Sequence, residues 1–159
     1  MRTARSLRLG TLGALMALTA ATVAASSQSR PFTVVLDGNA QPVVTGCTIQ
    51  NTETGTGYAT HMGTITWQSS ESVDACGPDT IVHGQIVMTS ATGEQVTGTY
   101  TTIAQINFPA NEVKAAGLFT ITGGTGRFSA ASGDGVISAE GSVLPPSGVL
   151  GHLTGTIDF

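Results

Sequence analysis

Charge of either sign is scarce in this chain, and basic residues are the scarcest. Only 10% of the 159 residues are charged, with six Lys and Arg against ten Asp and Glu. Three of the six basic residues, Arg2, Arg5 and Arg8, lie in the first eight positions. Without that segment three basic residues face ten acids, a net charge of −7. Because such a surface repels phosphate backbones, we expect no nucleic-acid partner.

Long apolar runs, helical periodicity and catalytic motifs are also missing. Beyond the N-terminal segment no apolar run reaches the roughly 20 residues of a membrane span, so none is expected after that segment is removed. No HxH, HExxH or G-x-S-x-G pattern occurs, and we expect neither a metal nor a cofactor. The acids are dispersed, and nothing in their spacing favours a carboxylate pair. Whether the protein is an enzyme therefore stays open.

The N-terminus has the layout of a secretory leader. Its basic start is followed by an apolar stretch over residues 9–21, and the small residues Val23, Ala24 and Ala25 precede a polar segment. This order predicts a signal peptide over residues 1–25 and a single domain over 26–159, either secreted or held in the periplasm or cell envelope. The alternative is a membrane anchor, for which the apolar run is short.

Two cysteines, Cys47 and Cys76, fall in the expected mature domain. In an exported chain a single pair is typical of a disulfide, and two cysteines without a histidine at ligand spacing do not make a zinc site. We predict a Cys47–Cys76 disulfide whose closed loop contributes about 3–4 kcal/mol in the chain-entropy model.

The mature sequence alternates apolar and polar residues in short runs separated by turn residues. This pattern predicts strands and no long helix. We expect eight strands, at residues 32–36, 43–51, 57–68, 80–90, 95–106, 117–122, 134–143 and 149–159. Their hairpin-sized connections and mid-strand glycines favour a single eight-stranded antiparallel β-barrel of calycin-like form. A two-sheet β-sandwich is the alternative.

A glycine-rich turn carries a family resemblance. Residues 119–135 read FTITGGTGRFSAASGDG, and residues 57–63 read GYATHMG. Together they resemble the allene oxide cyclase/dirigent superfamily of eight-stranded barrels, in an exported bacterial branch. Independently of that resemblance, the residues themselves predict a structural turn, formed by Gly123, Gly124, Gly126, Arg127 and Phe128. Phe128 would anchor it in the core, and Arg127 would pair with an acid such as Asp134 or Glu140.

The resemblance implies a barrel interior that holds a small apolar molecule, but no catalytic residue of that superfamily can be matched here. From their types and strand positions, the candidate cavity-lining residues are His61, Trp67, Tyr100 and Phe119. We predict an exported barrel that binds a small apolar ligand or has a structural role without catalysis. The alternative is a cyclase, isomerase or dirigent-like protein that steers a small apolar substrate in the barrel. The sequence leaves the oligomeric state open.

Overall fold

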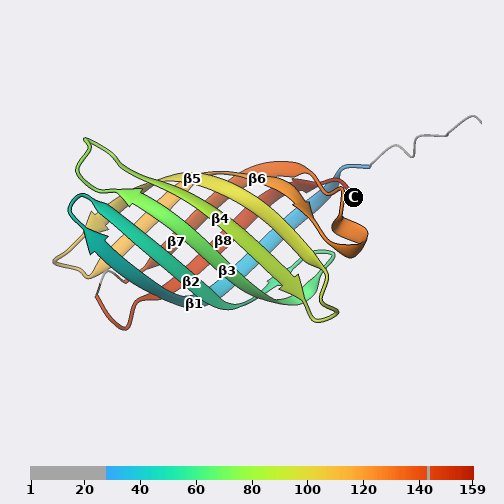
Figure 1. The fold of residues 1–159 in the computed structure, drawn as a ribbon, viewed down its shortest axis with the longest axis horizontal. Coiled ribbons are helices and arrows are strands. Elements are labelled where there is room, and N and C mark those ends of the chain that lie inside the picture. Colours follow the sequence, from blue (N-terminus) through green and yellow to red (C-terminus); the bar gives the residue numbers. More distant parts are fainter. Residues whose placement is uncertain (1–27, 143) are drawn as a thin grey trace, which may run out of the picture.

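The fold is a closed barrel of eight antiparallel strands in chain order, each paired with its sequence neighbours and β8 with β1 (Figure 1). The computed structural model describes residues 28–142 and 144–159, so the expected signal peptide lies outside the described residues. The strands are β1 Arg30–Thr45, β2 Thr48–Ala59, β3 Gly63–Asp74, β4 Thr80–Ser90, β5 Gln95–Asn107, β6 Glu112–Gly124, β7 Gly133–Gly141 and β8 Gly148–Ile157. The predicted barrel is confirmed, and the sandwich alternative is wrong.

Several expected strand boundaries differ from the structure, and two of the expected strands contain a turn. The expected strand at 57–68 is a hairpin, in which β2 ends at Ala59, the chain turns through His61, and β3 begins at Gly63. The expected strand at 43–51 likewise contains the turn between β1 and β2, at Gly46 with a φ of 60°. Each of these turns is only two or three residues long and includes His61 or Cys47, which are not typical turn residues. Neither turn therefore interrupts the pattern that predicts a strand.

Large side chains fill one end of the barrel, which we call the closed end. Phe32, Ile65, Met88 and Ile157 are almost fully buried there. The short 3₁₀ helix η1, Gly126–Phe128, folds across this end and buries Phe128 completely. The Phe128 ring stacks against that of Phe159 with 4.7 Å between centroids. This end of the interior is therefore an apolar plug.

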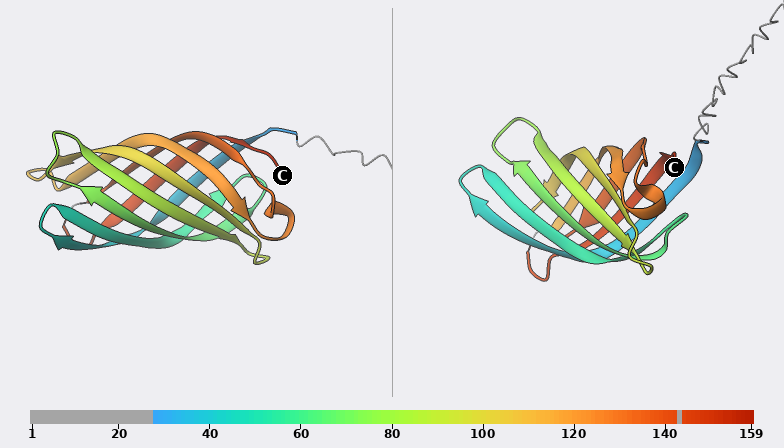
Figure 2. Two further views of the ribbon diagram at one scale, coloured as in Figure 1. Left: turned by 45° about the horizontal axis from the view of Figure 1, so that its top comes forward. Right: turned by 45° about the vertical axis from the view of Figure 1, so that its right-hand side comes forward.

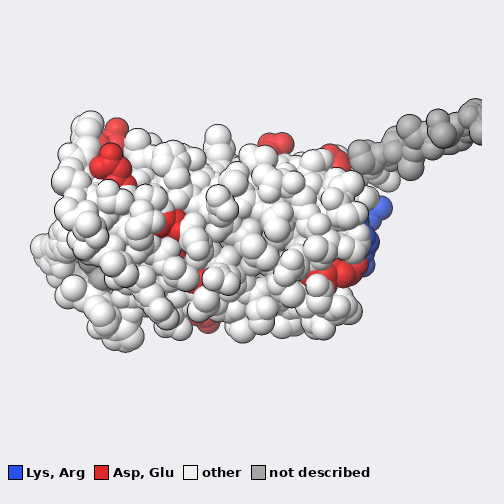
Figure 3. All heavy atoms as spheres, viewed as in Figure 1, with Lys and Arg blue, Asp and Glu red and all other residues white. Residues whose placement is uncertain are grey.

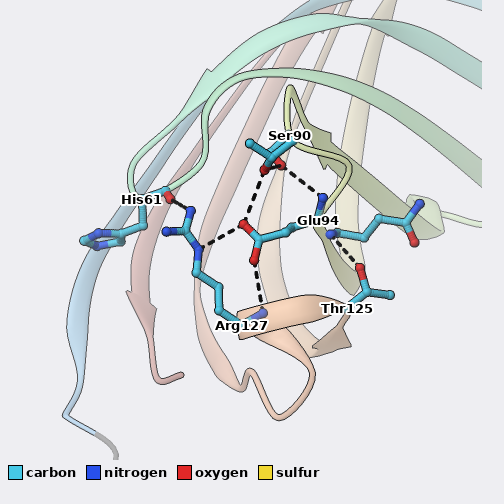
Figure 4. A network of polar contacts seen from close by, with 7 residues as sticks. His61, Ser90, Glu94, Thr125 and Arg127 are labelled. Atoms are coloured by element: carbon cyan, nitrogen blue, oxygen red, sulfur yellow. Dashed lines mark hydrogen bonds and ion pairs between the residues drawn. The ribbon is translucent and has the colours of Figure 1, made fainter.

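A polar network fixes η1 against two hairpin turns at the closed end (Figure 4). Glu94, in the turn between β4 and β5, accepts the Arg127 backbone N–H at 3.1 Å and pairs with its guanidinium at 3.2 Å. The same guanidinium donates to the His61 backbone carbonyl. The expected partners Asp134 and Glu140 were wrong, because η1 folds back over the barrel end and brings Arg127 to the turn between β4 and β5.

The opposite end, which we call the mouth, carries the turns β1–β2, β3–β4, β5–β6 and β7–β8 (Figure 2). Cys47, in the first of these turns, is bonded to Cys76 in the second, with their Cα atoms 5.2 Å apart. The predicted disulfide therefore links two neighbouring hairpin turns at the rim. Among the described residues no helix is long and apolar enough to cross a membrane.

Replacing both Cys47 and Cys76 with Ser should lower the free energy of unfolding by about 3–4 kcal/mol, because the cross-link restricts the unfolded chain. Urea unfolding followed by circular dichroism measures the change. Reductant should destabilise the wild type by a similar amount and leave the double variant unaffected. If the double variant is as stable as the oxidised wild type, the disulfide does not stabilise the fold as predicted.

Candidate ligand cavity

A cavity of about 180 Å³ occupies the mouth half of the barrel interior. Its floor includes Leu36, Trp67 and Ile86, and its lining reaches the rim at Pro42 and Val73. The cavity exists because many inward positions of this half carry small residues, namely Ala40, Ala104, Ala115, Ala139, Gly141 and Gly151. An eight-stranded barrel is just wide enough to be filled by side chains, so small residues in one half leave space for a small ligand.

Four polar side chains interrupt this apolar wall at mid-depth. Asn51 and Glu53 point inward from β2, and Ser69 and Glu71 point inward from β3. The register places Asn51 directly opposite Glu71 and Glu53 directly opposite Ser69. Residues two apart along a strand point to the same face, and paired residues on neighbouring strands lie side by side. The carboxyl groups of Glu53 and Glu71 therefore lie in one patch of the wall.

Hydrogen bonds join these residues into one cluster with Tyr100. The Asn51 amide donates to Glu53 Oε1 at 3.1 Å and to Glu71 Oε1 at 2.9 Å. The Tyr100 hydroxyl donates to Glu71 Oε2 at 2.7 Å and lies 2.7 Å from Ser69 Oγ. We call Asn51, Glu53, Ser69, Glu71 and Tyr100 the acid cluster. A single amide group thus bridges the two carboxyls.

The surroundings of the acid cluster favour the protonated form of Glu53. Burial, and then the nearby Glu71, raise the pKa of Glu53 to about 8, against a smaller lowering by the Asn51 hydrogen bond. Burial and the Glu71 charge also raise the pKa of Tyr100, so its hydroxyl keeps its proton and can donate. At neutral pH the cluster therefore holds a proton that an exposed carboxyl would have released.

Tyr100 reaches β3 from β5 because the strand between them carries Gly84 at the crossing point. Gly84 pairs with both Glu71 and Tyr100. A Cβ at position 84 would overlap the Tyr100 ring. The Trp67 ring reaches from β3 to β1, where a Cβ at position 38 would lie 2.7 Å from it, and its indole N–H donates to the Thr56 carbonyl at 3.0 Å. Mid-strand glycines thus make room for aromatic rings lying against the wall.

The four residues expected to line a cavity occupy different places. Trp67 and Tyr100 line the cavity, while Phe119 is buried but is not part of its lining. His61 is exposed in the turn between β2 and β3, with a φ of 67°, and its ring lies 5.6 Å from that of Phe159 at the closed end. His61 therefore departs from the expectation because it belongs to a turn, where strand alternation does not apply.

The site residues predicted from the sequence do not include Asn51, Glu53, Ser69 and Glu71. Both faces of β2 are rich in polar residues and glycine, so alternation does not distinguish its inward face. The segment at Glu71 was expected to be a loop, whereas β3 continues to Asp74. The sequence does indicate the inward face of β3, because Ile65, Trp67 and Val73 recur at alternate positions. Ser69 and Glu71 occupy the alternate positions between Trp67 and Val73.

Comparison of the chain with protein-family models, curated proteins and solved structures finds no match. Within residues 28–142 and 144–159, no group of three or more His, Cys, Asp or Glu side chains is placed to hold a metal ion. The site is therefore interpreted from its own geometry.

The Gly84→Ala substitution should displace the Tyr100 ring and destabilise the barrel by about 1–3 kcal/mol, as overpacking in a filled wall does. Gly148→Ala is the matched control, since a Cβ there meets nothing within 4 Å. Thermal unfolding measures the stability, and the near-ultraviolet circular dichroism of the tyrosines reports the displacement. Equal behaviour of the two variants would contradict the proposed crossing.

Glu53 should make stability depend on pH. Between pH 4.5 and about 8 the folded protein keeps a proton that the unfolded chain releases, so this contribution is complete below pH 4.5 and is lost as pH rises through about 8. The loss is on the order of a few kcal/mol. Urea unfolding at several pH values should show a shallower decline in Glu53→Gln than in the wild type.

The control for this experiment is Asp134→Asn, which removes one acid from an exposed position outside the cavity lining. It should keep the pH dependence of the wild type. If Glu53→Gln and the wild type lose stability in parallel over this pH range, Glu53 does not hold the proton.

Proposed function

We propose that this chain is an exported protein that binds a small, largely apolar molecule in the mouth half of its barrel. The proposal rests on the cavity of about 180 Å³, which is lined by apolar walls and a few convergent polar groups. An engineered cavity of about 150 Å³ in another protein binds benzene, so the space suits a single-ring molecule. Concave apolar sites with a few placed polar groups are typical of small-molecule binding.

Two features support export and reversible access. The Cys47–Cys76 bond is typical of proteins in oxidising compartments. The cavity reaches the rim, where Pro42 and Gly148 line it and are exposed. A small molecule can therefore enter without opening the barrel, whose strand pairing is continuous around the wall.

Binding can be read from Trp67, because it is the one tryptophan of the sequence and lies in the cavity floor. Titration with benzyl alcohol or toluene should give a saturable change in tryptophan emission. Ala115→Phe fills the cavity from β6 and should weaken binding about tenfold or more, the equivalent of at least about 1.4 kcal/mol.

The neighbouring substitution Ala116→Phe is the matched control, because Ala116 is exposed and is not part of the cavity lining. It should leave the affinity unchanged. Absence of any saturable response to both probes in the folded wild type would overturn the proposed function. A response that Ala115→Phe leaves intact would place the binding outside this cavity.

A further inference from the structure

The acid cluster is rich in hydrogen-bond acceptors and poor in donors. Both N–H groups of the Asn51 amide are used by the two carboxyls, and the Tyr100 hydroxyl proton is used by Glu71. The single Ser69 proton serves the Gln85 carbonyl at 3.0 Å or the Tyr100 oxygen. Among the described residues, Glu53 accepts one hydrogen bond, that from Asn51. Apart from the proton that Glu53 holds at neutral pH, the cluster has no donor left for its remaining acceptor sites.

Asn51 shows this shortage directly. Its side chain is 91% buried in the cavity wall, and its Oδ1 atom has no hydrogen-bond partner among the described residues. A buried acceptor without a donor costs about 1–3 kcal/mol, and a native structure that keeps one calls for an explanation. A ligand that donates hydrogen bonds to Glu53 and Glu71 would release the Asn51 amide from them, so that its oxygen could turn toward the ligand.

The described residues also provide no positive charge to the cavity. Its charged lining residues are Glu53, Glu71 and, at the rim, Glu140. At the closed end Arg30 lies over the ring of Phe159 and Arg127 over the ring of Phe128. In the view of Figure 3 the blue atoms of Lys and Arg gather at one end of the barrel. Lys114 is exposed and pairs with Glu112 at 2.8 Å. Two buried carboxyls therefore face each other without a compensating cation, an arrangement that keeps a proton on Glu53 in the empty cavity.

We propose that the cavity ligand carries a protonated amine, whose N–H groups are bound by the carboxyl groups of Glu53 and Glu71. This inference rests on the proposed function and adds the chemical class of the ligand. An ammonium offers up to three donors and the missing positive charge, and the apolar body of the ligand occupies the space lined by Ala104 and Ala115. The occupant is thus a small apolar amine.

Binding of an amine is coupled to a proton. Since Glu53 keeps its proton at neutral pH in the empty protein, an arriving ammonium displaces that proton to the solvent. The ionisable groups facing Glu53 are Glu71 from β3 and Tyr100 from β5. The described inward residues of β1, β4, β6, β7 and β8 are not ionisable, and Glu140 of β7 is exposed at the rim. Affinity for an amine should therefore rise as the pH increases from about 6 to about 8, while the amine itself stays charged.

The experiment compares benzylamine, benzyl alcohol and benzoate, which share one ring and differ in the charge of the polar group. Isothermal titration calorimetry and Trp67 emission measure their affinities for the full mature protein at near-neutral pH. Benzylamine should bind at least about tenfold more tightly than benzyl alcohol, because charge-assisted hydrogen bonds are about twice as strong as neutral ones. Benzoate should bind most weakly. Calorimetry in buffers of different ionisation enthalpy should show proton release with benzylamine alone.

Two variants test the residues, and a third is the control. Glu53→Gln and Glu71→Gln should each reduce the preference for benzylamine over benzyl alcohol to below about threefold while benzyl alcohol still binds. Asp134→Asn removes the same charge from an exposed position outside the cavity lining and should keep the preference. Either glutamine variant suffices if the other fails to fold.

The outcomes separate this inference from the proposed function. If benzyl alcohol binds as tightly as benzylamine, or if both glutamine variants keep the preference, the amine assignment is overturned and the cavity still binds small molecules. If none of the three compounds binds to the folded protein, the proposed function and the amine assignment are both overturned.

Discussion

Pairing of β8 with β1 is the constraint on which the rest of the structure depends. Residues 148–157 and 30–39 form an uninterrupted antiparallel ladder, so each strand has two neighbours and the sheet has no open edge. Closure also assigns one face of each strand to the interior. The sizes of those inward residues then decide whether a given level of the barrel is filled or hollow.

The two halves of the interior follow from this rule. Along β1 the inward side chains are large near the closed end, at Phe32, and small near the mouth, at Gly38 and Ala40. Along β4 they are likewise larger at Met88 than at Gly84 and Val82. The level where the large residues meet is sealed by Phe128 from η1. The level of the small residues has no such insertion and forms the cavity. One strand topology thus yields both a plug and a cavity.

The strand number could be predicted from the sequence, because turn residues and alternation recur at intervals that suit hairpins. The positions of glycines were harder to interpret. The strand expected at residues 32–36 ends before Gly38, whereas β1 continues through it. A Cβ at position 38 would lie 2.7 Å from the Trp67 ring. Among the described residues glycine lies in turns, beneath aromatic rings and close to the backbone of neighbouring strands, and only its use in turns leaves a local pattern in the sequence. The superfamily resemblance of residues 119–135 stays a prediction.

The acid cluster could not be predicted because its members come together through register. Glu53 and Glu71 belong to different strands, and their shared partner Asn51 is opposite one of them and two residues from the other. Burying two carboxyls destabilises a fold unless other interactions compensate. The apolar plug and the Arg127–Glu94 contacts lie at the closed end, and the disulfide lies at the rim. Stabilising interactions on either side of the cluster therefore allow the wall between them to carry groups that would be better satisfied by a ligand.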